Sequence, residues 1–172
     1  MTGAVDTAPR AAKPSRWAIG AYVLAAVIVV LDQLSKYWIL SVLRLPEQAT
    51  VEVLWPLQFT RIWNEGVSFG LFQAQHDIVR WGMVLFNLGV ALILLFWVRR
   101  TAQPVSAVGL ALVIGGAVGN AIDRARFGAV VDFIDVQRLG FFPWIFNIAD
   151  AGITVGVILL LLDSLRPQRP AA

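Results

Sequence analysis

Residues 17–38 read WAIGAYVLAAVIVVLDQLSKYW, and no charged side chain interrupts this stretch before Asp32. About 20 mostly apolar residues in a helix are enough to cross the hydrocarbon core of a bilayer. Three further stretches approach that length, at residues 81–98, 105–122 and 141–162. The sequence therefore predicts an all-α membrane protein, in which four transmembrane helices form a single domain over residues 17–162.

The composition fits a chain that lies mostly inside a membrane. Hydrophobic residues make up 58% and charged residues 15% of the 172 residues, whereas soluble domains average about 45–50% and about 25%. Cysteine is absent and His76 is the one histidine, so the chain cannot form a disulfide, a thiol nucleophile or a histidine-rich zinc site. We expect no metal and no cofactor, and chemistry that uses carboxylates, Ser, Lys or backbone groups.

The basic residues indicate how the predicted helices are oriented. Four spans place the N-terminal tail, residues 1–16, and the C-terminal tail, residues 163–172, on the same side as the turn at residues 99–104. These short segments contain half of the 14 Lys and Arg residues and almost no acid, so the positive-inside rule places both termini in the cytoplasm. We attribute the net charge of +3 to this bias, because the sequence has no basic stripe that would predict nucleic-acid binding.

Residues 41–80 form the longest segment between predicted spans and have signs of β-structure. The sequences TVEV (50–53) and LQFTRIW (57–63) are rich in strand-forming residues and partly alternate. A turn at residues 64–66 leads to a further apolar strand at 67–72, and residues 73–80 suit a short interfacial helix. We expect a small extracytoplasmic β-cradle between the first and second helices, resting on the membrane surface.

Polar side chains of the predicted spans gather near the outer membrane face. The residues at this depth are Asp32, Lys36, Asn87, Asn120, Asp123, Arg124, Asn147 and Asp150. Asp32 and Lys36 are four residues apart, a spacing that predicts a structural ion pair at the end of the first helix. Asp123 has Arg124 beside it, and we expect this cation to compensate its charge.

Asp132 and Asp150 have no cation near them in the sequence. Asp132 interrupts VVDFI (130–134) in the connection after the third span, and Asp150 follows FNIA (146–149) inside the fourth. A carboxylate in a span costs roughly 2.5–3.5 kcal/mol, so we expect both acids to have a functional role. Two acids that meet at one membrane face can share a proton, as in aspartic proteases. We predict that they form a catalytic pair with raised pKa values.

Five short motifs resemble those of the lipoprotein signal peptidases, the type II signal peptidases of bacteria. They are Asp32-Gln33-x-Ser35-Lys36, Asn64-x-Gly66-x-Ser68-Phe69-Gly70, Gly115-Gly116-Ala117-x-Gly119-Asn120-x-x-Asp123-Arg124, Val130-Val131-Asp132-Phe133 and Phe146-Asn147-x-Ala149-Asp150. The motifs follow the order of the family over residues 20–160, with no departure at a motif position. The resemblance is therefore highly specific.

The resemblance implies an aspartyl endopeptidase of the bacterial inner membrane. It would remove signal peptides from prolipoproteins by cutting just before a diacylglyceryl-modified cysteine, with Asp132 and Asp150 as the catalytic dyad near the outer face. Substrate-binding or supporting positions of the family correspond to Asn64, Gly66, Gly116, Asn120, Arg124 and Asn147, and structural ones to Asp32 and Lys36. The expected partners are lipid-modified prolipoprotein and membrane lipids, and we expect a monomer.

Other functions are compatible with the same polar residues. A small proton-coupled transporter would also hold acids in the membrane, but it predicts acids near the midplane with access from both faces. A Ser–Lys hydrolase built on Ser35 and Lys36 is a further alternative, although adjacent helical residues point about 100° apart. A non-catalytic assembly subunit would leave Asp132 and Asp150 unexplained.

Overall fold

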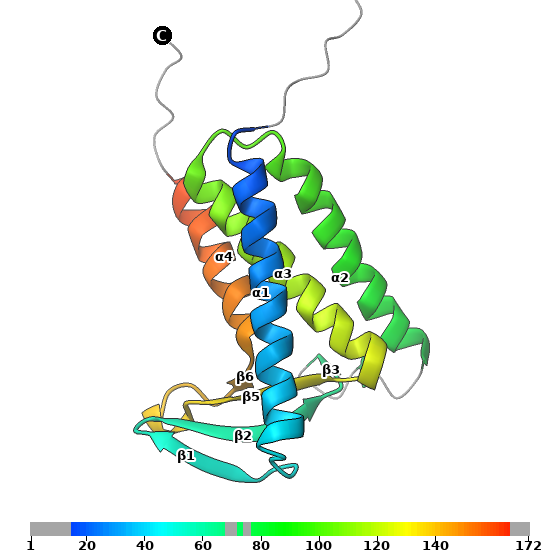
Figure 1. Ribbon diagram of the computed structural model, residues 1–172, viewed down its shortest axis with the longest axis vertical. Coiled ribbons are helices and arrows are strands. Elements are labelled where there is room, and N and C mark those ends of the chain that lie inside the picture. The colour runs from blue at the N-terminus through cyan, green and yellow to red at the C-terminus, as the bar shows by residue number, and fades with distance from the viewer. Residues whose placement is uncertain (1–14, 68–71, 74–76, 166–172) are drawn as a thin grey trace, which may run out of the picture.

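The computed structural model describes residues 15–67, 72–73 and 77–165. Within these residues, four α-helices form a bundle and a small sheet covers one end of it (Figure 1). The helices are α1 (Ala18–Tyr37), which continues as a π-helical segment (Trp38–Val42), α2 (Asp77–Val98), α3 (Pro104–Phe127) and α4 (Ile148–Ser164). The start of α1, the end of α4 and the turn between α2 and α3 lie at the end away from the sheet.

Three of the described helices are long and apolar enough to cross a membrane, namely Ala18–Val42, Asp77–Val98 and Pro104–Phe127. They cover the first three predicted spans except for Trp17, and they extend up to five residues beyond the predicted bounds. The fourth prediction, a span over 141–162, is wrong at its start, because α4 begins only at Ile148. Pro143 cannot donate a helical hydrogen bond, and Asn147 caps the first turn with its side chain. Helix α4 therefore has 17 residues and is about 26 Å long.

The sheet combines two separate parts of the chain. Strands β1 (Thr50–Leu54) and β2 (Leu57–Asn64) come from between α1 and α2, whereas β5 (Val130–Asp135) and β6 (Ile145–Phe146) come from between α3 and α4. The four strands are antiparallel in the order β1-β2-β5-β6. The prediction that the cradle lies between the first two helices is therefore incomplete, and the connection predicted to contain Asp132 forms the strand β5. All but one residue of β5 are buried, so the strand lacks the alternation that marks a half-exposed one.

A second sheet pairs the short strands β3 (Gly66–Val67) and β4 (Phe72–Gln73). The strand predicted over 67–72 falls partly outside the described residues. So does the interfacial helix predicted over 73–80, of which residues 77–80 belong to α2. Most of both predicted tails also lies outside the described residues.

Helix α3 lies at the centre of the bundle and packs against the other three helices. Glycines permit its close approach to α4: a Cβ on Gly116 would lie 2.3 Å from the carbonyl oxygen of Ala149, and one on Gly156 would lie 2.6 Å from that of Gly109. Membrane helices associate largely through such close contacts between small residues. Because Ala149 precedes Asp150, the Gly116 contact also positions the candidate catalytic acid.

Replacing Gly116 with Ala should lower the melting temperature of the protein in detergent. The new methyl group would meet a backbone carbonyl that cannot rotate away, and inserting a methyl into a packed contact costs about 1–3 kcal/mol. Gly82→Ala in α2 is the matched control, because a Cβ there meets nothing within 4 Å. Equal melting temperatures for the two variants would show that α3 and α4 do not need this contact.

Candidate active site

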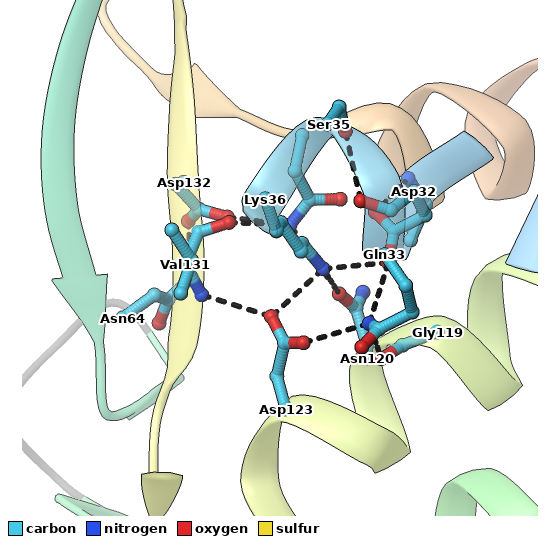
Figure 2. A network of polar contacts seen from close by, with 12 residues as sticks. Asp32, Gln33, Ser35, Lys36, Asn64, Gly119, Asn120, Asp123, Val131 and Asp132 are labelled. Carbon is cyan, nitrogen blue, oxygen red and sulfur yellow. Dashed lines mark hydrogen bonds and ion pairs between the residues drawn. The ribbon is translucent and has the colours of Figure 1, made fainter. Parts of the chain in front are cut away.

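Lys36 is the centre of a buried ion cluster between α1 and α3, which we call the Lys36 cluster (Asp32, Lys36 and Asp123). The Lys36 Nζ lies 2.8 Å from Asp32 Oδ2 and 2.8 Å from Asp123 Oδ2, and no side chain of the three is more than 3% exposed. Figure 2 shows the ammonium group between residues of α1 and α3. One ammonium between two carboxylates leaves a net negative charge, so the carboxylates need further donors.

Those further donors come from the backbone beside the two candidate catalytic acids. The amide of Ala149 donates to Asp32 Oδ1 at 3.0 Å, and the amide of Val131 donates to Asp123 Oδ2 at 3.1 Å. Ala149 immediately precedes Asp150, and Val131 immediately precedes Asp132. The Lys36 cluster thus holds both acid-bearing segments against α1 and α3.

Asp123 corrects one expectation from the sequence. Its partner is Lys36 from α1 and not the adjacent Arg124, because neighbouring helical residues point in different directions. Gln33, for which the sequence predicts no separate role, donates to Asp123 Oδ1 at 2.9 Å and to Asp32 Oδ2 at 3.2 Å. The sequence places Asp32, Gln33 and Lys36 close together on one helix. This spacing does not reveal that Gln33 and Lys36 both bind Asp123 on another helix.

Asp132 lies on β5, where it pairs in register with Ile62 of β2. The residue is 1% exposed, and its carboxylate accepts hydrogen bonds from two side-chain amides. Asn147 Nδ2 donates to Oδ1 at 2.6 Å, and Asn64 Nδ2 donates to Oδ2 at 3.0 Å. Gly66 orients the second amide, since its backbone N–H donates to Asn64 Oδ1 at 3.3 Å.

Asp150 lies in the first turn of α4 and is joined to Asp132 through Asn147. The side-chain oxygen of Asn147 accepts from the Asp150 backbone N–H at 2.9 Å, while its Nδ2 binds Asp132. Asn120 Nδ2 donates to Asp150 Oδ1 at 2.8 Å, and Asn120 Oδ1 accepts from Asn147 at 3.3 Å and from Lys36 at 3.5 Å. Two asparagines therefore connect the acids with each other and with the Lys36 cluster.

The two acids also interact through their charges. Burial raises the pKa of Asp132 to about 7, and the charge of Asp150 contributes in the same direction. The amides of Asn64 and Asn147 and the charge of Lys36 oppose this shift. Asp132 can therefore hold a proton near neutral pH.

Asp135 of the same strand shows the opposite behaviour. Its burial favours a higher pKa, but hydrogen bonds from the Gln137 amide, Thr60 and Gln58 outweigh that effect and leave the pKa below its usual value. These donors hold the carboxylate at 2.7–2.9 Å. The contrast indicates that Asp135 is a fully hydrogen-bonded structural anion, whereas Asp132 can exchange a proton.

The remaining predicted site residues have different surroundings. Arg124 is partly buried and interacts electrostatically with Asp150 and Asp132, and its buried Nε has no hydrogen-bond partner among the described residues. Gly116 contacts α4 at Ala149, the residue before Asp150.

The Ser–Lys alternative is not supported by the contacts of Ser35 and Lys36. Ser35 Oγ donates to the Asp32 carbonyl at 2.8 Å, while Lys36 binds carboxylates. No cluster of three or more metal-ligating side chains occurs in residues 15–67, 72–73 and 77–165.

Asn64→Ala should move the alkaline limb of kcat/KM to higher pH. The variant loses an amide that stabilises ionised Asp132, so the pKa of Asp132 rises further. If catalysis requires this proton, wild-type kcat/KM falls above a midpoint near pH 7, and the variant retains its rate to a higher pH. Gln58→Ala, which removes an amide from Asp135 on the same strand, should leave the midpoint unchanged. If Gln58→Ala shifted the pH midpoint of kcat/KM and Asn64→Ala did not, the midpoint could not belong to Asp132.

Fold and site define a helical membrane protein with two acids held together at one end of the bundle, beside a small sheet. The chain belongs to the signal peptidase II family, whose model matches residues 24–166. The resemblance found in the sequence is thereby confirmed. Membership in this family makes the chain a protease of the bacterial membrane.

Individual relatives and solved structures agree with this assignment. The chain is 53% identical over 145 residues to a lipoprotein signal peptidase of Caulobacter vibrioides, covering 84% of this chain and 85% of that protein. It is 43% identical over 143 residues to a lipoprotein signal peptidase of Methylorubrum extorquens, covering 81% of each. A solved structure described as a bacterial membrane enzyme has a TM-score of 0.77 and 31% identity, over 91% of this chain and 98% of that one.

Proposed function

We propose that this protein is an aspartic endopeptidase that removes signal peptides from prolipoproteins by cutting before the diacylglyceryl-modified cysteine. The observation that carries the proposal is the bridge through Asn147, which binds the Asp132 carboxylate and the backbone of Asp150 at once. Family membership and the names of the relatives support the substrate class.

The proposed mechanism uses one proton and one water molecule. The Asp150 carboxylate takes a proton from water as the water oxygen attacks the scissile carbonyl carbon, and Asp132 gives its proton to the carbonyl oxygen. The tetrahedral intermediate then breaks at the C–N bond, Asp150 gives its proton to the leaving amine, and Asp132 recovers a proton from the hydroxyl group. The raised pKa and the burial of Asp132 support its role as the acid.

The surrounding residues have supporting roles in this proposal. Asn64, Gly66, Asn120 and Asn147 orient the acids through the hydrogen bonds described above. Arg124, whose Nε has no partner among the described residues, is proposed to bind the substrate backbone. The function proposed for Gly116 is close packing of α3 and α4, and that for Asp32 and Lys36 is structural support of both acid-bearing segments.

The proposed membrane arrangement follows from the two ends of the bundle. We propose α4 as a fourth span, with the tails at 1–16 and 163–172 in the cytoplasm and the sheet on the outer face of the inner membrane. The sheet lies opposite the start of α1 and the end of α4 (Figure 1), Asp132 lies on strand β5 of that sheet, and Asp150 lies in the first turn of α4, which supports this arrangement. The active site would then lie near the outer lipid surface, where a monomer could receive a lipid-anchored substrate from the bilayer.

The proposed specificity can be tested with the purified protein in micelles. We expect it to cut a prolipoprotein carrying the diacylglyceryl cysteine on the N-terminal side of that residue, as read by mass spectrometry. The same prolipoprotein without the lipid is the matched substrate, and we expect its kcat/KM to be at least about tenfold lower, because apolar chains contribute to binding. Equal rates on the two substrates, or cutting at another bond, would contradict the proposal.

A further inference from the structure

The end of the bundle away from the sheet contains a cavity that the proposed peptidase reaction does not use. It has a volume of about 490 Å³ and is lined by Ser15, Arg16, Ala18, Ile19, Tyr22 and Arg99. Pockets of about 300–1,000 Å³ are typical of small-molecule sites. We propose that this cavity binds the phosphate headgroup of an anionic phospholipid.

The charge of the cavity selects an anion. Arg16 and Arg99 both line it, and in the described part of the chain neither guanidinium forms an ion pair. The flanking sequence supplies no acid either, since residues 15–31 and 78–122 contain no Asp or Glu. Guanidinium groups bind phosphate oxygens through two parallel hydrogen bonds, and two of them at one cavity favour a phosphate over a neutral ligand.

Backbone contacts hold the two arginine-bearing segments together. The Ser15 N–H donates to the Arg99 carbonyl at 2.8 Å, which ties the segment before α1 to the turn after α2. The Ser15 hydroxyl accepts from the Trp17 N–H at 3.2 Å, so its own proton is available to a ligand. The Arg16 guanidinium lies 4.7 Å from the centroid of the Trp17 ring, a contact that restricts the arginine.

The position of the cavity indicates a lipid and not a soluble phosphate. It lies at the first residues of Ala18–Val42, a helix long and apolar enough to cross a membrane. Ile19 lines the cavity and is 75% exposed, so it can contact the acyl chains below a bound headgroup. Trp17 belongs to the residue type that concentrates at the membrane interface. Basic pockets between membrane helices bind acidic headgroups on the cytoplasmic side, the side proposed here for this end.

The test compares lipid binding by the full chain in a neutral detergent, with phosphatidylglycerol as the probe. Bound lipid is counted by native mass spectrometry during a titration, and no activity measurement is needed. We expect Arg16→Gln and Arg99→Gln each to weaken binding about fivefold, and the double variant about 25-fold. Arg100→Gln is the matched control, because it removes the same charge at the same end from a residue outside the cavity. It should change binding less than about twofold.

The binding results distinguish a local phospholipid site from diffuse attraction to the basic end of the bundle. Selective loss in the two cavity variants, with the affinity of wild type falling as salt rises, supports it. An equal loss in Arg100→Gln would overturn it, because attraction would then be diffuse and not local to the cavity. Equal binding of phosphatidylcholine would overturn the requirement for an anionic headgroup. Inorganic phosphate that binds as tightly as the lipid would show that the acyl chains contribute nothing to binding, and would overturn the assignment to a lipid.

Discussion

Asp132→Asn should reduce kcat on a lipid-modified prolipoprotein by a factor of about 10³ or more. Asn has nearly the same size as Asp but cannot hold or release the proton that the proposed mechanism transfers, and one positioned acid or base typically contributes about 10²–10⁴. Asp150→Asn should have an effect of the same order, because the same step needs both groups. Turnover is measured by the rate of signal-peptide release from purified substrate.

Two controls separate lost chemistry from lost structure. Asp77→Asn removes a carboxylate whose side chain is 86% exposed, and it should leave kcat within about twofold of wild type. The difference in melting temperature between wild type and Asp132→Asn should be smaller at pH 8 than at pH 5, because the raised pKa means that ionising Asp132 weakens the wild-type fold as pH rises from about 4 to about 7. A folded Asp132→Asn protein that retains more than a tenth of wild-type kcat would contradict the proposed dyad.

Lys36→Met should destabilise the protein by about 3–5 kcal/mol, because removing one partner leaves buried charge uncompensated. Asp32 and Asp123 would both lose the ammonium group, and each is fully buried. These carboxylates hold the amides of Ala149 and Val131. Lower activity of the remaining folded protein is therefore also expected, and both effects are measurable by thermal unfolding and by turnover in detergent.

A triple variant provides the control for this prediction. Lys36→Met combined with Asp32→Asn and Asp123→Asn removes the ammonium and both charges together. It should recover much of the melting temperature lost by Lys36→Met alone, because no uncompensated buried charge remains. If Lys36→Met alone unfolded at the wild-type temperature, the Lys36 cluster could not be a main support of the site.

The sequence predicted the first three helices and the strands β1 and β2, but it did not predict β5 and β6. A stretch of about 20 apolar residues is long enough to cross a bilayer as a helix. The helices α1, α2 and α3 cover nearly all residues of the first three such stretches. The start of α4 was placed too early because Phe141, Phe142 and Trp144 are as apolar as a span, although they precede a strand that pairs with β5. Pairing between segments distant in sequence decides such cases, and hydrophobicity does not report it.

In the candidate site, the sequence predicted contacts within one helix but not contacts between different elements. Spacing on one helix identified the Asp32–Lys36 contact, and the absence of nearby cations singled out Asp132 and Asp150. The ion pair between Lys36 and Asp123 was missed, because adjacency in sequence suggested Arg124 and the true partner is on another helix. The role of Asn147 as a bridge depends on the relative placement of β5 and α4, which no local pattern contains.

The central claim is that Asp132 and Asp150 act as one pair that shares a proton. The most direct measurement is the pH titration of the Asp132 carboxyl, followed by carbon-13 NMR of labelled protein in detergent, in wild type and in Asp150→Asn. We predict a wild-type midpoint near pH 7 that falls in the variant, because the neighbouring negative charge is gone. A midpoint that is the same in both proteins, or a wild-type midpoint near the ordinary value for an aspartate, would contradict the account.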